Sequence, residues 1–488
     1  MKAIVFGAAL LGVVYGGAVR AGTPAPKSDR GGAAVPHLAY HIDIDADDIP
    51  RLPAISAARD IAGTQATAPT QTGPAGVSGM HDAGILTLES AIAEAVAWHP
   101  SLIEAARTLA ARDEDIAAAR TGYLPRISAG VGSGYDSRVA GTLRPRPQVG
   151  ASQMVYDFGK VSSEVAGAQA GAHVSRAEML LAVDTLIRDT AYALVEYQRA
   201  AAQRVVAREQ AESIRQISDL VGRRAALGAA TRSDALQAEA RVEAVVASLA
   251  TAEADERRWA SNLAFLLGRE GPPAEVTAEV PEWLMHSCAV PPPAWDTVPA
   301  AMIADAQVER SSAALRRNQA ERYPTLSLGG DASTDVTSPF GDRGIVNFGL
   351  RVSSNVFAGG VTKARVRGAT FELDAAQAGA RRVRNETSQR LTEAQQQIAS
   401  FSQVADILAS REGNMRETGR LYRIQYLEMG TRTLVDLLNA EQELQQVRFE
   451  GANTTRNLRR LQIDCLFLSG RMRDAFHLSG TSLRGVPL

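Results

Sequence analysis

The residues that could make or break bonds are scattered along this chain. Its 488 residues include seven histidines and two cysteines, which form no recognised metal-binding motif. The sequence lacks His-Glu-x-x-His, Cys-x-x-Cys, Gly-x-Ser-x-Gly and a phosphate-binding loop. Gly159-Lys160 comes nearest to such a loop, but Val161 follows it instead of serine or threonine. Most carboxylates fall beside arginines on expected helix faces. We therefore predict a protein that is not an enzyme and that holds no metal or cofactor.

Charged residues of interest are grouped at two similar glycine turns, over residues 228–234 and 430–436. Glycine permits the positive φ at which a helix hairpin turns, and a threonine three residues later can cap the returning helix. The glycines and threonines concerned are Gly228, Thr231, Gly430 and Thr433. We expect the function of the chain to depend on the charges that surround these turns.

The two turns belong to two copies of one pattern, about 200 residues apart, which indicates duplication. In each copy a proline precedes a stretch with strand character, and an aromatic residue and glycine then lead into a long helical run. These junction residues are Pro125, Phe158 and Gly159 in the first copy and Pro324, Phe357 and Gly360 in the second. The copies are expected over residues 85–280 and 281–470.

Each copy contains one expected strand hairpin, over 126–158 and 325–357. The second alternates clearly: Val346, Phe348, Leu350, Val352 and Val356 face one way, and Asn347, Arg351, Ser353 and Asn355 face the other. Strands of about 9–11 residues cross a membrane at a tilt. Four strands cannot close a barrel, and open edges are not tolerated in lipid. Three chains would supply twelve strands.

Long helices follow each hairpin. Residues 159–227 contain no proline, and as one helix they would extend for about 100 Å. Apolar residues at heptad spacing over 231–266 and 437–468 predict that the helices pair as coiled coils. A soluble helical bundle would explain the heptads but not the hairpins.

The remaining segments lie before, between and after the main elements of the two copies. Residues 1–21 have the charged start, apolar region and small-x-small end of a signal peptide. Residues 22–84, rich in Pro, Ala and Gly, predict a mostly disordered leader. The link over 271–293 is expected to wrap around the helices, and the tail over 471–488 has no clear pattern. The net charge of −2 gives no reason to expect nucleic acid as a partner.

Cys288 and Cys465 are the only cysteines of an exported chain. Their spacing does not establish whether they pair. Cys465 lies on an apolar helix seam, which favours a buried free thiol.

The doubled pattern resembles the TolC family of outer-membrane channel-tunnel proteins over about residues 85–470. The resemblance rests on the Tyr-x-Pro or Tyr-Pro before each hairpin, the aromatic exits, and the two Gly-x-x-Thr turns. It implies a mixed α and β membrane protein, a homotrimer whose 12-stranded outer-membrane β-barrel has four strands per protomer. A periplasmic α-helical coiled-coil tunnel would continue the barrel. Its implied partners are outer-membrane lipid, a periplasmic membrane-fusion adaptor, and an inner-membrane ABC secretion ATPase or efflux pump.

The resemblance also implies roles at the turns. Asp436 would line the periplasmic aperture, so that three copies form an acidic ring, while Asn439 occupies the place of a frequent second acid. Arg432 would form a latch to Ser233 and Asp234 of another protomer.

Together these features predict an outer-membrane export duct. The second turn resembles the form found in channels that serve secretion, and this resemblance favours type I secretion of a protein such as a repeat-containing (RTX-type) toxin or adhesin. The alternative within this class is efflux of drugs or metals by a tripartite pump. A periplasmic coiled-coil adaptor or structural protein is the alternative of another class, and it would not need strand hairpins.

Overall fold

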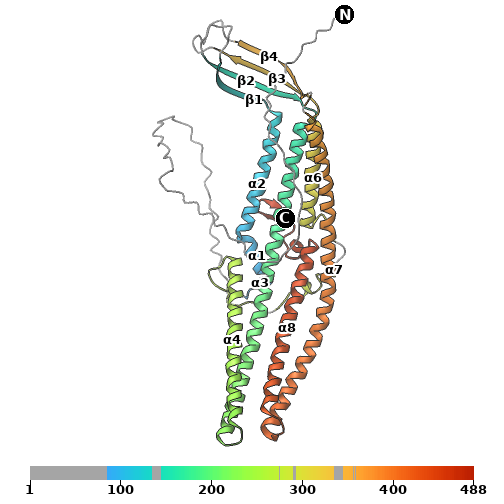
Figure 1. The fold of residues 1–488 in the computed structure, drawn as a ribbon. Coiled ribbons are helices and arrows are strands. Elements are labelled where there is room, and N and C mark those ends of the chain that lie inside the picture. Colours follow the sequence, from blue (N-terminus) through green and yellow to red (C-terminus); the bar gives the residue numbers. More distant parts are fainter. Residues whose placement is uncertain are drawn as a thin grey trace, which may run out of the picture. The chain divides into compact units, whose positions relative to one another are not determined.

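The computed structural model describes residues 85–487, except for 135–143, 274, 278, 290–292, 335–344, 356 and 358. The expected signal peptide and leader lie outside the described residues. Figure 1 shows the order of the elements. The helices are α1 (Leu88–Trp98), α2 (Pro100–Arg120), α3 (Lys160–Ala226), α4 (Arg232–Leu267), α5 (Glu282–Met285), α6 (Pro299–Ala320), α7 (Val361–Ile424), α8 (Leu434–Leu468) and α9 (Met472–Ala475). A short 3-10 turn, η1 (Thr121–Tyr123), follows α2, and a π-helical turn, η2 (Gln425–Met429), follows α7.

Four antiparallel strands form one sheet in the order β1-β2-β3-β4. They are β1 (Arg126–Gly134), β2 (Arg144–Tyr156), β3 (Thr325–Ser333) and β4 (Ile345–Ser353). Both predicted hairpins are therefore present, and β2 pairs with β3 to join the two copies. The described parts of the sheet leave β1 and β4 as its two edges. A second, two-stranded sheet joins β5 (Ser482–Leu483) and β6 (Val486–Pro487).

The register separates an apolar face of the sheet from a polar one, because residues paired across antiparallel strands point to the same side. Ile127 pairs with Ala151, Ala151 with Gly330, and Gly330 with Phe348. The large side chains of this apolar face are exposed, with 78% of Phe348 accessible. They are Ile127, Val131, Val149, Leu328, Val346, Phe348, Leu350 and Val352. The alternation predicted for β4 is confirmed, although Val356 lies outside the described residues.

The helices form one layer. Its two edges lie on the same sides of the protomer as the two edges of the sheet. Next to the sheet the packing order is α2-α3-α6-α7, and towards the tips it is α4-α3-α8-α7. The predicted long helix is confirmed, since α3 has 67 residues, or about 100 Å. Among the described elements, α2 and α4 stand at one edge of the layer and α7 at the other. No helix among the described residues is long and apolar enough to cross a membrane.

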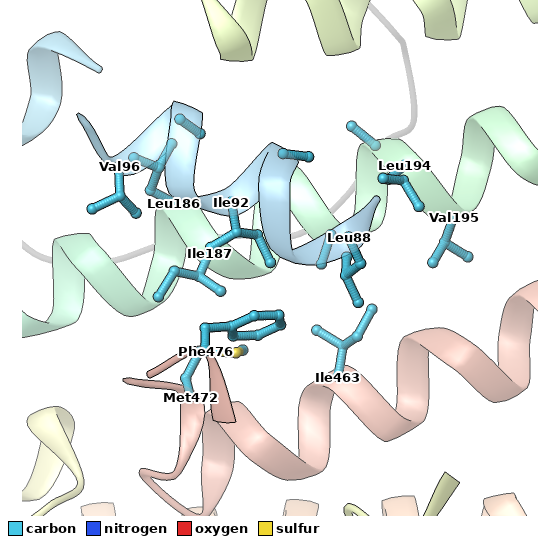
Figure 2. Close-up of a cluster of buried hydrophobic side chains, with 14 of the residues drawn as sticks. Leu88, Ile92, Val96, Leu186, Ile187, Leu194, Val195, Ile463, Met472 and Phe476 are labelled. Carbon is cyan, nitrogen blue, oxygen red and sulfur yellow. The ribbon is translucent and has the colours of Figure 1, made fainter. Parts of the chain in front are cut away.

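The main hydrophobic core lies where α1, α3, α8 and the C-terminal segment meet (Figure 2). Ile92, Ile187 and Ile463 are buried there, together with Met472 and Phe476 of the segment whose sequence has no clear pattern. The neighbouring Arg473 donates to Asp184 Oδ2 (3.0 Å), and both side chains are buried. The tail after α8 is therefore part of the core.

The expectation of a free thiol at Cys465 is wrong, because Cys465 forms a disulfide with Cys288. Their Cα atoms are 5.3 Å apart, which is an ordinary distance for such a bond. The link between the two copies packs against α8 here, with Leu284 fully buried and Ser287 Oγ donating to the Gln462 carbonyl (2.9 Å). The seam residue is buried as predicted, but it has a covalent partner.

Candidate functional site at the helix tips

The first tip connects α3 to α4 through Gly228, which has a φ of +71°. Thr231 caps α4: its hydroxyl accepts a hydrogen bond from Asp234 N (3.0 Å), and its own N–H donates to Asp234 Oδ2 (3.1 Å). Ser233 also binds Thr231, with 2.8 Å between the two hydroxyl oxygens. Gly228 thus provides the left-handed turn, and Thr231 caps the returning helix.

The second tip repeats this geometry. Gly430 has a φ of +62°, and Thr433 accepts a hydrogen bond from Asp436 N (3.2 Å). The Thr433 N–H and hydroxyl donate to Asp436 Oδ2 at 3.3 and 2.9 Å. Asp436 thus completes a reciprocal helix cap, a role that the sequence analysis missed. A threonine followed three residues later by an acid, in both tips, is the signal that would have identified it.

Arg432 lies beside this cap and is held by three neighbours of its own chain. Its guanidinium carbon is 4.5 Å from the centroid of the Tyr422 ring, Nε donates to Gln425 Oε1 (3.2 Å), and Nη1 is 3.9 Å from Asp436 Oδ2. The side chain still exposes 42% of its surface. Contacts within its own chain therefore orient the Arg432 side chain, which remains accessible to solvent.

An apolar cluster fixes the two tips against each other. Ile217 and Val221 of α3 pack there with Leu434 and Leu437 of α8 and with Tyr426 of η2. Other members of the cluster are Ala211, Ile214, Ala238, Val245 and Leu438.

A second contact joins the tips through Arg224. It donates to the Tyr426 carbonyl (3.0 Å), and its guanidinium carbon lies 5.1 Å from the centroid of the Tyr426 ring. Burial raises the pKa of the Tyr426 hydroxyl, an effect that Arg224 opposes. The tips of one chain therefore form a packed unit.

Within one chain, the predicted latch residues do not meet. The partners of Arg432 are those named above, whereas Ser233 and Asp234 bind Thr231. A latch between protomers stays a prediction, as does an acidic ring. Asp436 is partly exposed, with 39% of its side chain accessible, and Asn439 is exposed one turn along α8.

The predicted junction residues lie where the strands meet the helices. Pro125 and Pro324 immediately precede β1 and β3, and Phe357 is 90% exposed after β4. Gly159 and Gly360 are the residues before α3 and α7, with φ values of +94° and +81°. The described residues of both junctions thus lie between a helix and a strand.

The residue before each of these glycines is also left-handed. In the second copy it is Gly359, whereas in the first copy it is Phe158, at a φ of +58° that is unfavourable for a side chain. The Asp157 carboxylate accepts hydrogen bonds from Gly159 N and Val161 N and so supports this turn. The stabilising role of Asp157 was not predicted.

Comparisons with known proteins agree with this geometry. The family described as outer membrane efflux protein matches residues 91–269 and 299–470, more than half of the chain. The outer membrane efflux protein BepC of Brucella suis is 24% identical over 379 residues, which cover 74% of this chain and 80% of BepC.

Two solved structures have the same fold. A membrane protein from Pseudomonas aeruginosa has a TM-score of 0.71 at 18% identity and covers 78% of this chain and 90% of its own. The CmeC outer membrane channel of Campylobacter jejuni has a TM-score of 0.68 at 15% identity, with coverage of 79% and 85%. The expected fold, a mixed α and β channel protomer built from two repeats, is therefore confirmed.

Proposed function

Since this chain belongs to the outer membrane efflux protein family, we propose that it forms the outer-membrane duct of a tripartite export assembly. The protein is located in the outer membrane, with its helices in the periplasm, and it is a passive channel, not an enzyme. Energy for transport therefore has to come from an inner-membrane partner.

This proposal rests mainly on one observation. The sheet and the helix layer have their open edges on the same two sides of the protomer. One side of the protomer presents β1, α2 and α4, and the opposite side presents β4 and α7. If β4 of one protomer pairs with β1 of the next, α7 meets α2 and α4 of that same neighbour. The ring that closes the barrel then also closes the tunnel and leaves no strand edge in lipid.

The exposed faces of the sheet agree with this closure. Polar and charged side chains share the face opposite to Phe348, with Asn347 donating to Asp331 Oδ2 (3.0 Å) across β4 and β3. Other residues on that face are Arg126, Ser128, Ser152 and Arg351. In the closed barrel the apolar face would contact lipid and the polar face would line a water-filled lumen.

The tips are the proposed meeting point with a periplasmic membrane-fusion adaptor. Leu227 exposes 85% and Met429 63% of its surface, directly before Gly228 and Gly430. Apolar side chains at the ends of two helix hairpins offer a partner a surface for docking. Through the adaptor the duct would join an efflux pump or an ABC secretion ATPase of the inner membrane.

The tips would also hold the closed state of the duct. Arg432 is accessible and oriented by Tyr422, so we propose that it reaches Asp234 and Ser233 of a neighbouring protomer. Three Asp436 carboxylates would then surround the aperture. Asn439 adds hydrogen-bonding capacity to this ring but no charge.

Efflux of small molecules is the first candidate for the cargo, and its support comes from the family description and from the printed name of the Brucella relative. Type I secretion of an RTX-type protein is the second candidate. It is favoured by the second tip, the sequence from Gly430 to Ala440.

A deletion strain tests the duct and separates the two cargoes. Under the efflux proposal, loss of the chain raises sensitivity to small toxic compounds, leaves the proteins of the culture medium unchanged, and is reversed by the intact gene. Loss of one protein from the medium, with unchanged sensitivity, would assign the duct to secretion. If deletion changes neither property, the proposal is wrong.

A further inference from the structure

The first junction contains a depression of about 510 Å³ that the sequence motifs do not explain. Its lining residues belong to the first turn of α3, to the last turn of α6 and to the segments that join these helices to the sheet. Figure 1 shows these two helix ends next to the sheet. These two helices pack together inside one protomer, so the depression does not lie at either open edge of the layer. Its polar lining includes Ser162, Ser163, Arg316, Gln319 and Arg322.

The charge of this depression is positive and locally uncompensated. Among the described residues, neither Arg316 nor Arg322 has an acidic partner, and Arg316 donates only to Ser312 Oγ (3.2 Å). The nearby acid Glu321 is instead paired with Arg365 (3.4 Å). Two free guanidinium groups beside serine hydroxyls form a suitable site for the oxygens of a phosphate.

Aromatic rings connect the depression to the apolar face of the sheet. Tyr156 pairs with Leu326, which in turn pairs with Val352 on that face. The centroid of the Tyr156 ring is 4.7 Å from that of Phe158, and the Phe158 ring stacks on Tyr323 at 5.1 Å. Phe158 and Tyr323 form the aromatic wall of the depression. The aromatic wall of the depression therefore continues to the apolar face of the sheet.

Of the two copies, only the first has an aromatic residue directly before its junction glycine. The second copy has Gly359 at the position of Phe158, with the same φ of +58°. Phe158 therefore has an unfavourable backbone conformation at the position where its ring lines the depression. Exposed aromatic rings at the end of a barrel mark the level of the lipid headgroups.

We propose that this depression binds the phosphate headgroup of a phospholipid from the inner leaflet of the outer membrane. Arg316 and Arg322 bind the phosphate oxygens, while Phe158 and Tyr323 contact the glycerol and the first carbons of the acyl chains. The bound lipid fixes the junction between barrel and tunnel at the membrane surface.

Native mass spectrometry of the detergent-purified assembly, titrated with phosphatidylglycerol, tests the proposal. The wild type should retain one tightly bound lipid per protomer. Arg316→Gln/Arg322→Gln should weaken this binding at least about tenfold, because two charge-assisted hydrogen bonds are lost. Arg317→Gln is the matched control, since Arg317 is adjacent but lies near Glu164 (3.8 Å). Its affinity should equal that of the wild type.

A further variant and further ligands identify the source of the phosphate and control for misfolding. Phe158→Gly installs the residue of the second copy, suits the positive φ, and should weaken lipid binding without loss of thermal stability. Diacylglycerol, which lacks a phosphate, should not bind. Equal lipid binding by the double variant and the wild type, equal binding of diacylglycerol, or displacement of the lipid by millimolar inorganic phosphate would each overturn the proposal. The measurement does not depend on cargo or pump, so its failure is distinct from failure of the export function.

Discussion

Removal of the Cys288–Cys465 disulfide should destabilise the helical region measurably. The bond joins the link between the two copies to α8, and the Cys465 side chain is fully buried. Gln395 Nε2 of α7 donates to the Cys288 carbonyl (3.1 Å), so the same point also contacts α7. Breaking the bond removes the covalent connection between segments that are otherwise held by packing and hydrogen bonds.

The expected magnitude follows from the chain that the bond closes. The two cysteines are separated by 177 residues. The loop-closure relation for a chain of that length gives about 5 kcal/mol per chain as an upper value. With an unfolding entropy of about 2 cal/mol/K per residue, this corresponds to a fall of about 5 °C in the unfolding midpoint of a chain of this size.

Thermal unfolding, followed by far-ultraviolet circular dichroism, measures this effect in Cys288→Ala, Cys465→Ala and the double variant. Each single substitution already removes the whole bond, so the double variant should lose little more than either single one. The reasoning is refuted if the double variant unfolds at the wild-type temperature, or if the denatured wild type reacts with a thiol reagent before reduction.

Substitutions at three further positions test the tips and the buried pair of Asp184 and Arg473. Arg432→Ser should raise conductance in planar bilayers, because a latch contact contributing about 0–1 kcal/mol is lost in each protomer; wild-type conductance would exclude the latch. Asp436→Asn keeps an acceptor for Thr433 but removes the charge, so cation preference and block by a trivalent cation should weaken, whereas Asp436→Ala should also lose about 1 kcal/mol of helix capping. Unchanged selectivity in both variants would place Asp436 away from the aperture. Burial raises the pKa of the Asp184 carboxyl from 3.8 to about 7 despite the opposing charge of Arg473. Between about pH 4 and 7 the folded chain holds a proton that the unfolded chain has released, so stability should fall as pH rises over this range and should level off above it; Asp184→Asn should remove this dependence, and an identical pH profile in the variant would refute the assignment.

The periodicity of the sequence predicted the main elements because their environment follows a simple geometric repeat. Alternation over Val346 to Val352 reflects a strand with two different faces, and this needs no knowledge of distant segments. The long helix beginning at Lys160 has no proline to interrupt it. The turns at Gly228 and Gly430 were equally predictable, because their conformation is determined by the local chain.

Contacts between distant segments were not predictable in the same way. Cys288 lies in a link without periodicity, and only the packing of that link against α8 brings it to Cys465. Similarly, Met472 is buried by α1 and α3, which are far away in the sequence.

Two features of the tips were also missed, and for different reasons. The cap role of Asp436 was a local signal, whereas the contact of Arg224 with Tyr426 depends on two hairpins meeting.

The number of chains in the detergent-extracted particle tests the central claim most directly. One face of the sheet exposes apolar side chains, and the sheet and the helix layer are open on the same two sides. Other copies of the chain are therefore required to complete the barrel. Mass measurement of the particle, corrected for bound detergent, should give three protomers. A stable particle with the mass of a single chain, which is at most 51.8 kDa, would contradict the account.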